Sequence, residues 1–151
     1  MAPRIIDRFR GEYSFLSNFA WVGSTTVEHK FQAEKTLDEV ERAKILRAAT
    51  PRDAKRIGRW EIKARPDWEQ IKHERMKHWL EWKFSQPPFD LLLEATGEAV
   101  LIEGNQHGDD IWGCVWRNGT WAGQNWLGRL LMEVRSERRA AIKLAGAPSQ
   151  T

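Results

Sequence analysis

Two long stretches with helical periodicity constrain the fold of this 151-residue chain more than any other feature of its sequence. Between Asp67 and Phe84, apolar side chains recur every three or four residues, which predicts one amphipathic helix. Between about Asn125 and Ala145, a second apolar face predicts the last helix, whose basic end suits the negative C-terminal pole of the helix dipole. The chain is therefore expected to be rich in helix. The first apolar stripe contains Trp68, Ile71, Met76, Trp79, Leu80 and Trp82.

Shorter helices are marked by their capping residues. The run Thr25–Glu28 has the S/T-x-x-E spacing of a capping box and predicts a helix that continues to about Lys35. Asp38 is a candidate cap for the next helix. The pair Thr50-Pro51 predicts a third start, because proline is favoured at the first helical position, and Gly58 is expected to close that helix.

The remaining elements are short. The Asn118-Gly119 pair lies between apolar positions and predicts a hairpin, because a type I′ turn needs positive φ at both central residues. We therefore expect an α+β fold, a helix-rich single domain with a small, mostly antiparallel sheet over residues 1–145 and a flexible tail over residues 146–151. Short strands are predicted over residues 4–8, 19–22 and 99–103, and a short helix over residues 88–96.

Composition excludes several classes of protein. Cys114 is the single cysteine, so neither an internal disulfide nor a cysteine zinc site is possible. The four histidines lack metal-binding spacing, so we expect no metal and no cofactor. No apolar run approaches the roughly 20 residues that span a bilayer, and residues 1–4 do not begin a secretory signal, so a cytoplasmic protein without membrane contact is expected. The small surplus of 24 basic over 21 acidic residues does not by itself indicate nucleic acid.

Three polar stretches are hard to explain as ordinary surface: residues 14–19, residues 28–35, and residues 104–113 followed by 123–128. They resemble the NADAR/YbiA family, whose motifs match Ser17-Asn18-Phe19, Glu28 to Lys35, Asn105 to Gly113 and Gly123 to Arg135. Ile57-Gly58-Arg59 and Trp68-Glu69 also match, and the resemblance covers about residues 9–140. It implies a YbiA-like fold and an N-glycosidase that acts on a bond between ribose and nitrogen.

Two departures from the family pattern bear on substrate choice. Lys30 stands where the family often has an aromatic residue after Glu-His, and residues 116–121 form a bulkier hairpin than the glycine-rich loop of some relatives. The resemblance implies a nucleotide-like substrate, with ADP-ribosylated nucleic acid as a candidate partner. The first hypothesis is removal of ADP-ribose from guanine bases. The alternatives are hydrolysis of ribosylaminopyrimidine phosphate intermediates of riboflavin synthesis, and a non-catalytic module that binds NAD or ADP-ribose.

Cleavage of an N-glycosidic bond builds positive charge on the ribose, so the site needs a carboxylate near C1 of the ribose and assistance for the departing nitrogen. Glu28 at a helix N-terminus is expected to stay ionised, although it could merely complete the capping box with Thr25. Lys35, two helical turns further on, is a solvated lysine, a phosphate or ribose contact, or an amine that forms a Schiff base with the opened sugar. Asp109 is either a turn residue or the group that assists the leaving base.

The remaining candidates would bind substrate. Trp68, Trp112 and Phe19 are expected to stack on rings, whereas Trp79, Trp82 and Trp126 are expected in the core. Arg59 would contact a phosphate. The resemblance adds three asparagines that position the substrate, of which the last is also a plausible helix cap: Asn18, Asn105 and Asn125.

Overall fold

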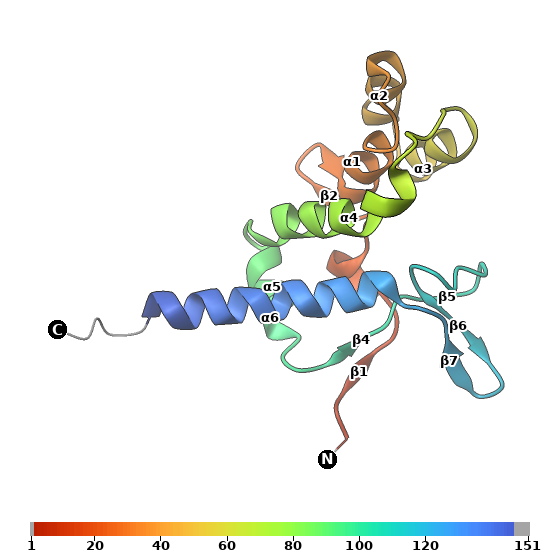
Figure 1. Cartoon of the computed structure of the whole chain (residues 1–151). Coiled ribbons are helices and arrows are strands. Elements are labelled where there is room, and N and C mark those ends of the chain that lie inside the picture. Colours follow the sequence, from red (N-terminus) through yellow and green to blue (C-terminus); the bar gives the residue numbers. More distant parts are fainter. Residues whose placement is uncertain (1, 147–151) are drawn as a thin grey trace.

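The computed structural model describes residues 2–146 of the chain and shows an α+β fold that is rich in helix (Figure 1). A six-residue 3-10 helix, η1 (Gly11–Leu16), occupies part of the stretch expected to be a loop. The α-helices are α1 (Val27–Ala33), α2 (Glu39–Leu46), α3 (Pro51–Trp60), α4 (Trp68–Phe84), α5 (Phe89–Ala95) and α6 (Trp126–Gly146). The strands are β1 (Ile5–Ile6), β2 (Trp21–Val22), β3 (Thr25–Thr26), β4 (Val100–Leu101), β5 (Gly104–Asn105), β6 (Cys114–Arg117) and β7 (Thr120–Ala122).

The strands form three small sheets rather than one. β1 pairs with β4 in parallel, and β2 pairs with β3 in antiparallel orientation. In the third sheet, β6 lies between β5, to which it is parallel, and β7, to which it is antiparallel. The pairings therefore divide equally between the two orientations, where the sequence predicts a mostly antiparallel sheet. Parallel pairing joins segments far apart in the chain, such as Ile5 and Val100, which no local turn signal can reveal.

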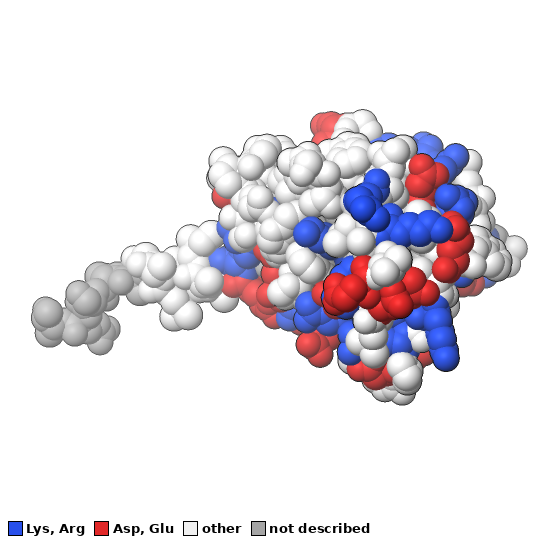
Figure 2. Space-filling model, turned by 90° about the horizontal axis from the view of Figure 1, so that it is seen from above, with Lys and Arg blue, Asp and Glu red and all other residues white. Residues whose placement is uncertain are grey.

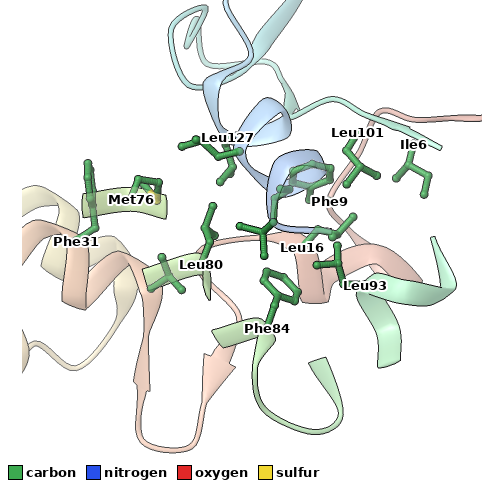
Figure 3. Close-up of a cluster of buried hydrophobic side chains, with 14 of the residues drawn as sticks. Ile6, Phe9, Leu16, Phe31, Met76, Leu80, Phe84, Leu93, Leu101 and Leu127 are labelled. Carbon is green, nitrogen blue, oxygen red and sulfur yellow. The ribbon is translucent and has the colours of Figure 1, made fainter. Parts of the chain in front are cut away.

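The main core lies where α4 and α6 pack side by side and the segments around β1 and β4 close over them (Figures 1 and 3). The apolar stripes of the two long helices supply most of its bulk, as their periodicity predicts. A second cluster joins α1, α2 and α3 through Ala33, Ile45, Ala54 and Ile57. The side chains of the main core labelled in Figure 3 are Ile6, Phe9, Leu16, Phe31, Met76, Leu80, Phe84, Leu93, Leu101 and Leu127.

Several local predictions are confirmed. The Asp38 carboxylate accepts from the backbone N–H groups of Val40 and Glu41, and the Thr50 hydroxyl accepts from the N–H of Asp53. Asn118 and Gly119 have φ values of 51° and 77°, as a type I′ turn requires. Each of these signals acts between residues within three positions of one another.

Two boundary predictions are wrong. Thr26, not Thr25, caps α1, because Thr25 pairs with Val22 in the β2–β3 hairpin and the helix begins only at Val27. Gly58 does not end α3, which continues to Trp60. A Cβ on Gly58 would lie 2.1 Å from Oε1 of Gln32, so glycine is required there by the close packing of α3 on α1.

The last helix is anchored by a buried arginine of the fourth family motif. Arg135 donates to the Thr96 hydroxyl at 2.9 Å and to the carbonyl of Ala99 at 2.8 Å, which ties α6 to the turn before β4. Of the tail expected over residues 146–151, only Gly146 lies within the described residues, as the end of α6. No helix among residues 2–146 is long and apolar enough to cross a membrane. Basic and acidic side chains are interspersed on the face shown in Figure 2.

Candidate active site

Glu28 is the centre of the candidate site. Its backbone N–H donates to the carbonyl of Asn18 at 3.1 Å, which fixes the start of α1 against the preceding loop. Its side chain is buried, and Oε1 accepts a hydrogen bond of 2.8 Å from Nε2 of Gln32, one helical turn further along. Thr26 caps the helix with its hydroxyl, which accepts from the N–H of His29. The Glu28 carboxylate therefore does not serve a capping box with Thr25 and is free for chemistry.

Burial controls the charge of Glu28. Desolvation raises the pKa of its carboxyl above the ordinary value, because water no longer stabilises the anion. The hydrogen bond from Gln32 and the positive charges of Lys55 and Lys35 act in the opposite direction. The sequence predicts that the helix dipole is the main influence on the charge of this carboxyl. In the structure, the main influence is burial against neighbouring elements.

Lys35 lies beside this carboxyl without an ion pair to it among the described residues. Its Nζ donates to the carbonyl of Gly58 at 3.4 Å, so the side chain runs along α3. Burial lowers the pKa of the Lys35 amine, the charge of Glu28 raises it, and Lys55 and Arg59 lower it further. An amine with a lowered pKa is neutral for a larger fraction of the time and is a better nucleophile than a solvated lysine.

Glu103 is a second, half-buried acid that sequence reasoning did not select. It follows β4, and its Oε2 has no hydrogen-bond partner within residues 2–146. Burial and the charges of Asp109 and Glu28 raise the pKa of Glu103 to about 7, while Lys55 and Arg10 oppose the shift. The charge of Glu28 therefore acts on the carboxyl of Glu103. The single hint in the sequence is an acid at the end of the apolar strand predicted over residues 99–103.

Lys55 is a cation that acts on each of the three ionisable groups described above. It lies on α3, and its charge acts on Glu28, Lys35 and Glu103. Its Nζ lies 5.9 Å from the centre of the Phe19 ring, which is partly exposed at the same place. Lys55 lies outside the sequence motifs. It reaches the site because α3 packs on α1.

Asn18 provides an unpaired acceptor beside Glu28. Its side chain is buried, and its Nδ2 donates to Sδ of Met76 at 3.5 Å. Its Oδ1 has no hydrogen-bond partner in the described part of the chain. A buried polar atom without a partner is costly, so a substrate donor is the natural group to satisfy it.

The loop after β5 is held by its own side chains. Oδ1 of Asp109 accepts from the N–H groups of Ile111 and Trp112 at 3.1 and 2.9 Å. Asn105 donates to the carbonyls of Asp109 and Cys114 and accepts from the N–H of Asp109. Both side chains therefore shape the loop, and the charge of Asp109 reaches the site through its effect on the pKa of Glu103.

Asn125 is occupied in the same way. Its Oδ1 accepts from the N–H of Glu103 at 3.0 Å, and its Nδ2 donates to the carbonyl of Leu101 at 2.9 Å. It therefore positions the backbone of Glu103 rather than presenting its amide to a ligand. A helix-cap bond from its side chain is likewise not formed among the described residues.

The predicted stacking residues divide into two kinds. Trp68 is only 6% exposed and packs against Phe31 at a centroid distance of 5.0 Å, so it supports the site from the core. Trp112 is half-buried, meets Phe31 edge-on at 5.3 Å, and neighbours His73, whose ring lies against Trp126 at 4.2 Å. Only Trp112 of this pair can offer part of a ring.

Arg59 is exposed at the end of α3, and its guanidinium lies 4.9 Å from the centre of the Trp60 ring. Its charge reaches Lys35. Lys30 is turned away from Glu28, because two residues along a helix face different sides, and its Nζ lies 5.2 Å from the ring of Trp79. Trp79 and Trp82 pack on the core as expected. Residues 2–146 contain no cluster of three or more His, Cys, Asp or Glu side chains that could hold a metal ion.

Comparisons with known proteins show what the chain as a whole is similar to. The sequence model of the NADAR domain family matches residues 9–139 of this chain. N-glycosidase YbiA of Shigella sonnei is 42% identical over 135 residues, covering 83% of this chain and 82% of that protein. N-glycosidase Npun_R5314 of Nostoc punctiforme is 35% identical, covering 89% and 91%.

Two further relatives extend the comparison. The chloroplastic riboflavin biosynthesis protein PYRR of Zea mays is 39% identical over 133 residues, which are 79% of this chain and 20% of that protein. The NMR structure of the E. coli protein YbiA matches with a TM-score of 0.78 at 36% identity, covering 100% of this chain and 94% of that one. The family expected from the motifs and its fold are thereby confirmed. The chain belongs to the NADAR domain family.

Proposed function

We propose that this NADAR domain N-glycosidase hydrolyses the bond between the ribose of ADP-ribose and a guanine base. The observation that carries the proposal is the pair of carboxyls formed by the buried Glu28 and the half-buried Glu103, in one electrostatic cluster with Lys35 and Lys55. Two acids in different environments are what general acid–base cleavage of a glycosidic bond requires. Two cations suit the diphosphate of ADP-ribose: Lys55, whose charge acts on Glu28, and Arg59, whose charge acts on Lys35.

The two acids take different parts in the reaction. Glu28, in the anionic form that Gln32 stabilises, faces the positive charge that develops on the ribose and accepts a proton from the attacking water. Glu103, with a pKa of about 7, retains a proton near neutral pH and donates it to the departing guanine nitrogen. The hydroxyl of the water forms the new bond at C1 of the ribose as the C–N bond breaks. Asp109 acts through Glu103, whose pKa it raises.

Lys35 acts on the ribose. After water has broken the C–N bond and the ring of the released ribose has opened, the neutral amine attacks the aldehyde, one water is lost as the Schiff base forms, and another water restores the sugar and the amine. The lowered pKa of the amine supports this reading over a simple charge contact with phosphate. Asn18 offers its unpaired Oδ1 to a hydroxyl of the sugar, and Phe19 and Trp112 offer ring surface.

The test is incubation with ADP-ribosylated guanosine and detection of free ADP-ribose. Glu28→Gln should abolish release by the otherwise folded protein, because it removes the charge while keeping the shape. Gln70→Met, on the exposed side of α4, serves as a control with unchanged release. Full activity of the Glu28→Gln variant would refute the role of Glu28.

A second candidate is hydrolysis of a ribosylaminopyrimidine phosphate. The similarity to proteins named riboflavin biosynthesis protein PYRR favours it. The same carboxyls would serve, because the bond broken also joins a ribose carbon to nitrogen. Parallel assays with the two substrates separate the candidates, since the higher kcat/KM identifies the preferred one.

A further inference from the structure

A cavity of about 410 Å³ lies beside the carboxyl cluster and is not used in the proposed reaction. It is bounded by the segment after β1, by β5 and by the β6–β7 hairpin. Gly104 in its wall directly follows Glu103, and Arg10 in its rim lowers the pKa of Glu103. The cavity therefore adjoins the acid assigned to the leaving base. Its lining residues are Asp7, Arg8, Arg10, Gly104, Asn105, Gln106, Trp116 and Trp121.

One wall of the cavity is aromatic. Trp116 is 60% exposed, although a tryptophan on a two-stranded ribbon gains little by facing water. Its ring meets Trp121 edge-on at 5.2 Å, and Nε1 of Trp121 donates to Oδ2 of Asp7 at 3.1 Å. Trp121 is thus fixed against the body of the protein and supports the ring of Trp116. This wall belongs to the bulky hairpin that distinguishes the chain from some relatives.

The rim of the cavity is cationic. Arg8 and Arg10 are exposed, and neither guanidinium makes an ion pair or a hydrogen bond with any of residues 2–146. Asp7 is the one acid in the lining, and its carboxylate already accepts from Trp121. Two unpaired guanidinium groups beside an exposed indole match a phosphate joined to a flat ring.

The close approach of the hairpin depends on Gly104. A Cβ at this position would lie 2.2 Å from the carbonyl oxygen of Asp7 and 2.6 Å from the Trp121 ring. Glycine therefore lets Trp121 and the segment after β1 meet over β5, which closes one side of the cavity. The cavity is a consequence of this packing rather than a gap between loose segments.

We propose that the cavity binds a nucleotide of the single strand that carries the modified guanine, with its base on Trp116 and its phosphate on Arg8 and Arg10. The inference rests on the proposed function. Arg59 acts on Lys35, beside Glu28, where the diphosphate of ADP-ribose is placed, and Lys55 acts on both carboxyls, whereas Arg10 acts on Glu103. The strand must leave on the side of its guanine, so the cavity next to Glu103 lies on its path.

The first experiment measures binding without catalysis. A fluorescently labelled, unmodified single-stranded oligonucleotide is titrated with the wild type, Trp116→Ala and Arg8→Gln. Loss of one stacked base should weaken binding about 5- to 150-fold, the equivalent of about 1–3 kcal/mol. Arg8→Gln should also reduce the dependence of affinity on salt, because one phosphate contact is lost. Trp21→Ala and Arg47→Gln, two exposed positions outside the cavity, are the matched controls and should bind like the wild type.

The second experiment compares two substrates. Trp116→Ala should lower kcat/KM for ADP-ribosylated guanine within an oligonucleotide and leave kcat/KM for ADP-ribosylated guanosine unchanged. Equal loss on both substrates would overturn the inference, because the cavity would then hold part of ADP-ribose itself. Unchanged oligonucleotide binding by both cavity variants would overturn it too. If the wild type hydrolyses neither substrate but Trp116→Ala loses oligonucleotide binding, the proposed function fails and the nucleotide site stands.

Discussion

The hydrogen bond from Gln32 to Glu28 offers a direct test of the electrostatics of the site. Gln32→Met keeps the length and much of the volume of the side chain but removes the donor. Among the influences that lower the pKa of Glu28, the Gln32 bond is the largest, ahead of Lys55 and Lys35. Its loss leaves a buried carboxylate with one partner fewer, so the protonated form gains relative to the anion.

The size of the effect follows from the energy of such a bond. A hydrogen bond to a charged group contributes about 1.5–3 kcal/mol, and one pKa unit corresponds to about 1.36 kcal/mol. The pKa of Glu28 should therefore rise by about 1–2 units in Gln32→Met. Because Glu28 acts as the anion, the acidic limb of the profile of kcat/KM against pH should move upward by the same amount.

Two measurements check this prediction. Carbon-13 NMR of the side-chain carboxyls follows the titration of Glu28 without any substrate, and the pH profile of ADP-ribose release follows it in the reaction. Gln70→Met serves as the control and should leave both unchanged. A Glu28 pKa that is unmoved in folded Gln32→Met would refute the reasoning about the bond. A shift seen by NMR without a matching kinetic shift would refute the role of Glu28.

A second route to the same change uses Gly58. Its Cβ in Gly58→Ala would meet Oε1 of Gln32 at 2.1 Å, so the amide must move from its position beside Glu28. The upward shift of the Glu28 pKa should therefore recur without any change at Gln32 itself. If the pKa of Glu28 in Gly58→Ala equals that of the wild type, the Gln32 amide can move without losing its hydrogen bond to Glu28.

Three further predictions concern other ionisable groups. Glu103→Gln should lower kcat about 10²- to 10⁴-fold and remove the basic limb of the pH profile, measured by ADP-ribose release. Borohydride should trap ADP-ribose on the wild type, detected by mass spectrometry, and Lys35→Arg should lose this adduct. Lys83 is buried, and desolvation lowers its pKa to about 7. The free energy of unfolding should therefore rise less steeply between about pH 7 and 10.5 in Lys83→Met than in the wild type, as measured by urea denaturation.

The sign of the last prediction follows from proton counts. Between about pH 7 and 10.5, the unfolded chain keeps the proton on Lys83 while the folded protein has released it, so unfolding takes up a proton. The free energy of unfolding of the wild type therefore gains roughly 1.4 kcal/mol per pH unit from this group in that window. Equal slopes for the wild type and Lys83→Met would contradict the lowered pKa. A retained adduct in Lys35→Arg, or an unchanged basic limb in Glu103→Gln, would contradict the other two assignments.

Much of the secondary structure follows from local signals. The caps at Asp38 and Thr50 act on N–H groups within three residues, and the Asn118-Gly119 turn needs only its own backbone geometry. The apolar stripes of α4 and α6 likewise follow from spacing along one helix. Glu28 and Lys35 could be selected for the same reason, because they stand in one short motif with a recognisable order.

Other features depend on a contact that competes with a local signal. Thr25 has the spacing of a helix cap, but its pairing with Val22 in the β2–β3 hairpin moves the start of α1 by one residue. Gly58 has the character of a helix end, but the packing of α3 on Gln32 requires it within the helix. At Thr25 a competing local pairing prevails over the helix cap, whereas at Gly58 a tertiary contact prevails over the local preference.

The sequence by itself determined the family, most of the helices and the selection of Glu28 for the candidate site. Only the tertiary structure decided that Glu103 and Lys55 join it. It also decided that the side chains of Asn105, Asp109 and Asn125 form hydrogen bonds with backbone groups. The reason is physical: caps and turns depend on neighbours in sequence, whereas burial and charge depend on neighbours in space. The pKa of a carboxyl is therefore a property of the folded chain and cannot be assigned from its motif.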